Sequence, residues 1–130
     1  MHHELLDPAL RFSAHVVHGA GRGRKLKIPT INVALGDAPP SLMHGVYACR
    51  IVLDDRQYMG AMHYGPRPVF ADSESLEVHV LDAALTAVPE EVTLEVVARL
   101  RDVQNFPDAQ SLKNAIADDI RSVRAILRKP

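Results

Sequence analysis

Residues 45–53 read GVYACRIVL, and this stretch indicates the class of fold that the chain adopts. It is rich in β-branched and aromatic residues, and the pair Asp54-Asp55, typical of a turn, follows it directly. A run of this composition that ends in turn residues is the sequence signature of a β-strand. We therefore predict a strand over residues 45–53.

Two further segments show the two-residue period of a strand. In residues 76–81, three aliphatic side chains alternate with Glu77, His79 and Leu81. Because successive side chains of a strand point to opposite faces, Glu77 and His79 share the face opposite the aliphatic side chains. Residues 92–99 alternate in the same way, and shorter strands are predicted at residues 14–17, 32–35 and 58–63. Prolines lie in the gaps between strands, where they remove no ladder hydrogen bond, at positions 39, 40, 66, 68 and 89.

The pattern changes near the C-terminus. Apolar residues recur there at spacings of four, four, three and four, at Leu112, Ile116, Ile120, Val123 and Leu127. This period predicts one amphipathic helix, with Asp108 or Ser111 as its N-cap. Several short strands followed by one helix predict a mainly β fold, a small closed or nearly closed antiparallel barrel with the helix packed outside.

The bulk properties limit the classes of function. The 130 residues carry a formal net charge of -1, so no overall positive field draws the protein to nucleic acid or to an anionic membrane. The single cysteine, Cys49, excludes an intramolecular disulfide. No segment has the roughly 20 apolar residues of a membrane span, and we expect a cytoplasmic monomer. We assign residues 1–10 to an N-terminal extension and residues 11–130 to one barrel domain.

A glycine-rich basic segment, HGAGRGRKLKIPTIN, occupies residues 18–32. Alternate glycines allow backbone amides to approach an anion, and basic side chains add charge-assisted contacts to phosphate oxygens. The alternative is an ordinary hairpin turn with solvated charges. Neither a P-loop nor a dinucleotide-binding motif is present.

Thr30 and Asn32 follow a rigid proline at alternate positions. Their side chains carry hard oxygen atoms, which Mg²⁺ prefers, and Mg²⁺ completes its shell with phosphate and water. The alternative role for both residues is to cap a turn.

The segment GxGRGxxLxxPTxN at residues 19–32 resembles the nucleotide-binding segment of the riboflavin kinase family. The resemblance runs in order from Arg11 to Leu127, through GVYACRIV, YGPRPVF, LEVHVLD and LRDVQNFPDAQSLKNAIADDI. It implies a six-stranded antiparallel Greek-key barrel. It also implies a Mg²⁺-dependent enzyme that transfers the γ-phosphoryl group of ATP to the 5'-hydroxyl of riboflavin and releases FMN and ADP.

The resemblance also implies a role for each site residue. Residues of the basic segment would surround the nucleotide phosphates, namely Gly19, Gly21, Arg22, Gly23, Arg24 and Lys27. Thr30 and Asn32 would hold Mg²⁺, and Glu77 would be the catalytic base. Arg101, Asn105 and Phe106 would lie on the flavin side, and His79 would be a hydrogen-bonded structural neighbour.

Two positions depart from the family pattern. Lys27 replaces a glycine two residues before the Pro-Thr, and Val88-Pro89 replaces a Tyr-Gly turn. If position 27 requires positive φ, its lysine costs roughly 1 to 3 kcal/mol. The alternative function is therefore a non-catalytic member of the fold that binds a flavin or a nucleotide. A nucleic-acid binder is disfavoured, because the chain has only six Phe and Tyr residues and no paired aromatics on a strand.

Overall fold

The computed structural model describes residues 3–18, 28–66 and 73–128. Strands and helices follow the chain in the order β1 (Glu4–Val17), β2 (Thr30–Val33), a short 3-10 helix η2 (Leu35–Asp37), β3 (Gly45–Leu53), β4 (Arg56–Pro66), β5 (Glu74–Val80), β6 (Glu91–Arg101) and α1 (Ala109–Leu127). The predicted mainly β class is confirmed, and the strand predicted over residues 45–53 coincides with β3.

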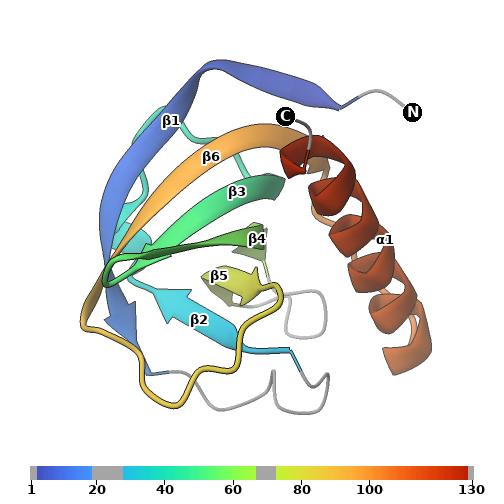
Figure 1. Cartoon of the computed structure of the whole chain (residues 1–130). Coiled ribbons are helices and arrows are strands. Elements are labelled where there is room, and N and C mark those ends of the chain that lie inside the picture. The colour runs from blue at the N-terminus through green and yellow to red at the C-terminus, as the bar shows by residue number, and fades with distance from the viewer. Residues whose placement is uncertain (1–2, 19–27, 67–72, 129–130) are drawn as a thin grey trace.

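The six strands form a closed barrel in the order β1-β2-β5-β4-β3-β6, with every neighbouring pair antiparallel (Figure 1). Strands β3, β4 and β5 follow one another as hairpins, and β6 returns to lie beside β3. This is the strand order of a Greek key. The predicted antiparallel Greek-key barrel is thus confirmed.

The barrel interior is filled by the apolar half of each alternating strand. Its fully buried side chains include Ile31, Val33, Ile51, Met62, Leu76, Val78, Leu94 and Val96. The opposite half of each strand faces outward and is polar on β5, as the two-residue period predicted. Polar groups on β2 and β5 therefore lie on the outer face of the barrel wall.

Gly60 on β4 shows how closely the strands pack. A Cβ at this position would lie 2.7 Å from Val78 Cγ1 and 3.2 Å from Cys49 Sγ. We expect Gly60→Ala to lower the free energy of unfolding by about 1 to 3 kcal/mol, the cost of overpacking a filled core. Denaturant unfolding measures this loss.

The matched control for this variant is Gly36→Ala. Nothing lies within 4 Å of a Cβ at Gly36, and we expect almost no change in stability there. Equal unfolding midpoints for the two variants would contradict the packing argument.

Helix α1 covers a second apolar cluster on the outside of the barrel, at one side of the ring in Figure 1. Small side chains on the wall, Ala48, Ala61 and Ala98, face Val123 and Leu127 of the helix. Their size permits the close approach of helix and sheet. The helix is the amphipathic helix predicted from the C-terminal period.

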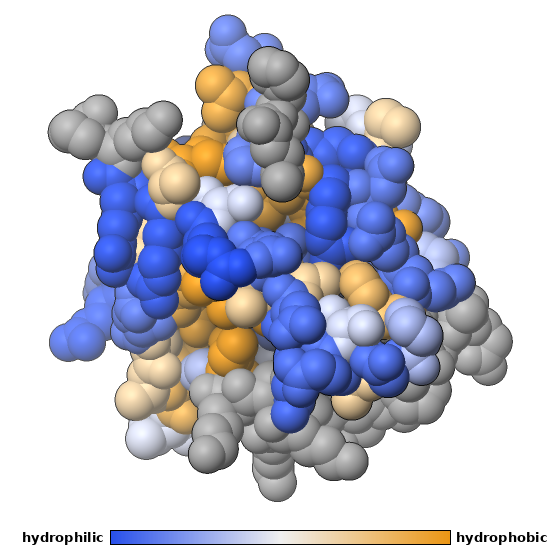
Figure 2. Space-filling model, turned by 90° about the vertical axis from the view of Figure 1, so that its right-hand side faces the viewer, coloured by the Kyte–Doolittle hydropathy of each residue, from blue (hydrophilic) through white to orange (hydrophobic). Residues whose placement is uncertain are grey.

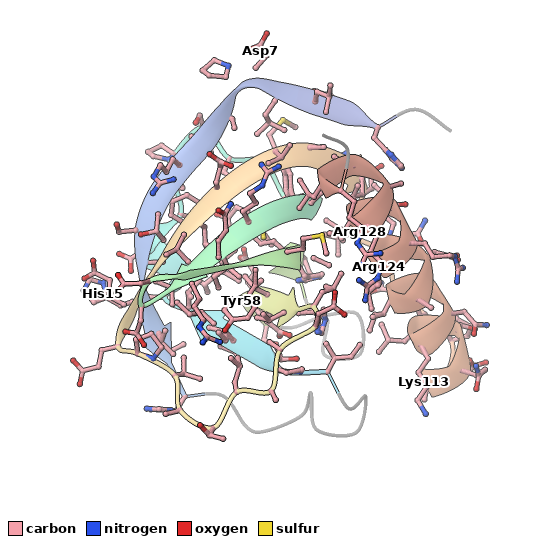
Figure 3. The ribbon with its side chains drawn as sticks, in the orientation of Figure 1. Asp7, His15, Tyr58, Lys113, Arg124 and Arg128 are labelled. Atoms are coloured by element: carbon pink, nitrogen blue, oxygen red, sulfur yellow. The ribbon has the colours of Figure 1, made fainter. Side chains whose placement is uncertain are left out.

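Polar contacts fix the two ends of α1. Asp108 is the N-cap, because its carboxylate accepts a hydrogen bond of 2.7 Å from the backbone N–H of Ser111. Near the other end, the Arg124 guanidinium donates to both carboxylate oxygens of Asp82, at 2.7 and 2.9 Å. Arg124 and Arg128 extend toward the barrel, whereas Lys113 points away from it (Figure 3).

Every strand except β3 differs from its predicted bounds. Strand β1 begins at Glu4 instead of residue 14, and Glu4 and Leu5 pair with β6, so part of residues 1–10 contributes to the barrel. The pairing of β1 is irregular between Leu5 and Leu10, around Pro8, which interrupts the alternation. Strand β2 begins two residues earlier than predicted, and β4 continues through Pro66, which had been assigned to a gap.

Candidate active site

Strands β2 and β5 bring the predicted metal ligands and the predicted base together. Asn32 is the direct cross-strand partner of Glu77, and Thr30 is the partner of His79. Directly opposed residues share one face of the sheet, with Cβ atoms about 4.5 to 5.5 Å apart. Since Ile31 and Val78 between them are buried in the barrel, these four side chains share the outer face.

The Thr30 hydroxyl lies between two hydrogen-bonding groups. Its oxygen is 3.1 Å from Nδ1 of His79 and 3.3 Å from the carbonyl oxygen of Ile28. Burial lowers the pKa of His79, against the opposing effects of Glu77 and Asp119. His79 is therefore a neutral imidazole near pH 7, as expected for a hydrogen-bonded structural neighbour.

A second histidine extends this row of side chains onto β4. His63 is the cross-strand partner of Glu77 on the side opposite Asn32, and its Nδ1 lies 3.5 Å from the Ser75 hydroxyl. Burial lowers the pKa of His63 against the opposing effect of the Glu77 carboxylate, and the positive charge of Arg101 acts in the same direction as burial. The Glu77 carboxylate is thus next to two neutral imidazoles, His63 across the strands and His79 along its own strand.

The residues predicted for the flavin side lie at the end of β6, where Arg101 is the last residue, and in the loop that follows it. The Arg101 guanidinium binds both oxygens of Asp119, with Nε and one terminal nitrogen each at 2.8 Å, and Asp119 is only 6% exposed. The ring of Phe106 lies over this guanidinium, 5.7 Å from its central carbon to the ring centroid. The loop between β6 and α1 is therefore anchored to the helix through Arg101.

Asn105, in the same loop, lines an open hollow of about 490 Å³. Residues 102–105 form one wall of the hollow, and His44, Pro66 and Arg99 complete it. The side of the molecule that carries α1 is mostly hydrophilic, with apolar residues visible between the polar ones (Figure 2).

Several of the predicted site residues cannot be placed. Gly19, Gly21, Arg22, Gly23, Arg24 and Lys27 lie outside the described residues, so their contacts with phosphate stay predictions. Among the residues that are described, no group of three or more His, Cys, Asp and Glu side chains is arranged to hold a metal ion.

Reasoning from the sequence missed the roles of His63 and Asp119. The alternation of β4 could have placed His63 on the outer face, since Met62 beside it is buried in the barrel. No comparable signal for Asp119 is present in the sequence. An acidic residue on the buried side of a helix needs a charged partner, and only the fold shows that this partner is Arg101.

A family model described as riboflavin kinase (Flavokinase) matches residues 6–127. The chain belongs to the riboflavin kinase family. Within this family, the bifunctional riboflavin kinase/FMN adenylyltransferase of Pseudomonas fluorescens is 35% identical over 124 residues, which cover 94% of this chain and 40% of the relative. The Escherichia coli (strain K12) protein of the same description is 34% identical over 130 residues, with coverages of 97% and 41%. This chain therefore spans about two fifths of the length of these relatives and matches their riboflavin kinase part.

Solved structures agree with the fold of this riboflavin kinase family member. A crystal structure described as a macrolide-efflux protein from Streptococcus pneumoniae superposes with a TM-score of 0.76 and 28% identity, over 89% of this chain and 38% of that chain. The crystal structure of riboflavin kinase from Trypanosoma brucei superposes with a TM-score of 0.62 over 92% of this chain and 80% of that chain. At 21% identity, the second similarity concerns the fold alone.

Proposed function

We propose that this chain catalyses the Mg²⁺-dependent transfer of the γ-phosphoryl group of ATP to the 5'-hydroxyl of riboflavin, giving FMN and ADP. The observation that carries the proposal is the cross-strand pair of Asn32 and Glu77, with Thr30 on the same face. The pairing of β2 with β5 supports the proposal, because it puts the side-chain oxygens of Thr30 and Asn32 on the same face of the wall as the Glu77 carboxylate. Family membership supports the same reaction.

Thr30 and Asn32 fit a magnesium ion by the chemistry of their donors. Both offer neutral oxygen atoms from alternate positions of β2, on the face that also carries Glu77. Mg²⁺ in phosphoryl-transfer sites usually has only one or two protein ligands, and phosphate and water fill its other positions. When bound, the ion would neutralise the negative charge of the phosphate oxygens.

Glu77 is the proposed general base. The riboflavin 5'-oxygen forms the new bond to the γ-phosphorus, the bond to the bridging oxygen of ADP breaks, and Glu77 takes the hydroxyl proton. Because the transition state of phosphoryl transfer is loose, the main tasks of the protein are to orient the groups and balance their charge. The backbone pairing of β5 with both β2 and β4 holds Glu77 for this task.

The loop after β6 is the proposed flavin side. Asn105 lines the hollow, and its amide can exchange hydrogen bonds with a polar ring edge. Arg101 and Phe106 are in contact with each other, and Arg101 also binds Asp119. We therefore propose that these two residues act on the flavin by shaping the loop.

The proposal is tested by incubating the purified chain with riboflavin, ATP and Mg²⁺ and separating the flavins by chromatography. Formation of FMN is expected. Calorimetric titrations with riboflavin and with ADP accompany the assay. Binding without any FMN would instead identify a non-catalytic flavin- or nucleotide-binding member of the family.

Thr30→Ala should raise the Mg²⁺ concentration that gives half-maximal activity, because it removes one proposed oxygen ligand. We expect an increase of about tenfold, the effect of losing one contact to a charged group. Thr93→Ala on β6 is the control, and its metal titration should match the wild-type curve. A Thr30→Ala curve that also matches would remove Thr30 from the metal site.

In the part of the chain that the structure describes, no helix is long and apolar enough to cross a membrane. The cytoplasmic location, the monomeric state and the absence of nucleic-acid binding stay predictions.

A further inference from the structure

The hydroxyl of Thr30 has a defined neighbour on the adjacent strand. Nδ1 of His79 lies 3.1 Å from it, closer than the Ile28 carbonyl oxygen at 3.3 Å. A hydroxyl has one proton to donate and two lone pairs with which to accept. The group that receives this proton therefore decides where the lone pairs of Thr30 point.

The backbone holds the His79 side chain in this place. Its strand, β5, is paired on both sides, with Thr30 opposite His79 on β2 and Ala61 opposite it on β4. The residues before and after it, Val78 and Val80, are buried in the barrel. An imidazole nitrogen that carries no proton accepts hydrogen bonds, and Nδ1 lies within hydrogen-bond distance of the Thr30 hydroxyl.

We propose that His79 is the positioning residue of the metal and nucleotide site: its Nδ1 accepts the Thr30 proton and thereby turns the oxygen lone pairs toward the ion. His79 acts through Thr30 and does not itself bind the ion. The inference rests on the proposed function, because it takes Thr30 to be a ligand of Mg²⁺. It gives His79 a role in the metal and nucleotide site in addition to the structural role predicted from the sequence.

Asparagine and glutamine separate this role from simple space filling. In His79→Asn, the side-chain amide would lie near the place of Nδ1, whereas the longer side chain in His79→Gln puts its amide near the place of Nε2. His79→Phe keeps the ring and removes both nitrogens. The three variants therefore differ mainly in what they offer to Thr30.

The experiment is calorimetric titration of ADP in Mg²⁺ and in EDTA, with thermal melting to confirm that each variant is folded. In Mg²⁺, we expect His79→Phe and His79→Gln to bind ADP about three- to tenfold more weakly than wild type, the range for one lost hydrogen bond. We expect His79→Asn to stay within about twofold. In EDTA, all four proteins should bind ADP equally.

A double-mutant cycle with Thr30→Val tests the route of the effect. If His79 acts through Thr30, His79→Phe should cause no further loss of ADP affinity in the Thr30→Val background. A full additional loss would overturn the inference.

Two other results would also overturn it. The first is an equal ADP affinity of His79→Asn and His79→Gln in Mg²⁺, and this comparison does not require His79→Phe to fold. The second is a loss of ADP affinity in the variants that is the same in Mg²⁺ and in EDTA. A failure of the kinase reaction is distinguishable, since the wild-type chain would then bind ADP in a Mg²⁺-dependent way and form no FMN. Wild-type binding that is the same in Mg²⁺ and EDTA would refute both the metal site and this inference.

Discussion

Glu77→Gln is expected to lower the turnover number for FMN formation at least about 100-fold, while the affinity for ADP changes less than about twofold. Glutamine keeps the size of the side chain but cannot take the proton of the riboflavin hydroxyl. General base catalysis contributes about 100- to 10,000-fold in typical enzymes. Steady-state kinetics with both substrates saturating measure the turnover number, and calorimetry measures the ADP affinity.

Glu95→Gln is the matched control for this variant. Glu95 is also a partly buried strand glutamate, but it lies on β6 and forms an ion pair with Arg50 at 3.0 Å. We expect its variant to keep the turnover number of the wild type. Full activity of Glu77→Gln would exclude Glu77 as the base and with it the proposed mechanism.

Asp119→Ala is expected to have the largest effect on stability, a loss of about 3 kcal/mol in the free energy of unfolding. The substitution leaves Arg101 partly buried without its carboxylate partner, and removing one member of a buried ion pair is typically this costly. It also releases the loop that carries Asn105 and Phe106. We therefore expect the KM for riboflavin to rise more than the KM for ATP.

The neighbouring Asp118 provides the control, because its carboxylate is exposed and pairs with Arg121 on the surface. Exposed pairs contribute about 0 to 1 kcal/mol. Asp118→Ala should therefore unfold almost as the wild type does. If Asp119→Ala unfolded at the same denaturant concentration as Asp118→Ala, the Arg101 contact would not be the anchor of the loop.

The strands with a clear two-residue period were predictable from the sequence. β3 was predicted at its observed bounds, and β5 and β6 were predicted within two residues at each end. Strand β1 was predicted ten residues too short. The alternation of Leu10, Phe12, Ala14 and Val16 could have extended the prediction to residue 10, but the part before Pro8 has no regular period.

The site was predictable only where a residue's face follows from its strand. The two-residue period of the strand predicts that Glu77 and His79 lie on one face of the sheet, and the structure adds their cross-strand partners Asn32 and Thr30. Local patterns cannot reveal such pairings, because the partner strands are more than 40 residues apart in the sequence. The contact of Arg101 with Asp119, 18 residues further along the chain, also became visible only in the fold, because it depends on how α1 packs against the barrel.

The closure of the barrel through β1 has a consequence for biosynthesis. Strand β1 pairs with residues 91–99 of β6, which are made last among the strands, so the ring cannot close on the ribosome before this part of β6 has emerged. Until then β1 has a free hydrogen-bonding edge, which is prone to pairing with other chains. The newly made protein is therefore most exposed to aggregation while β6 and α1 are still being translated.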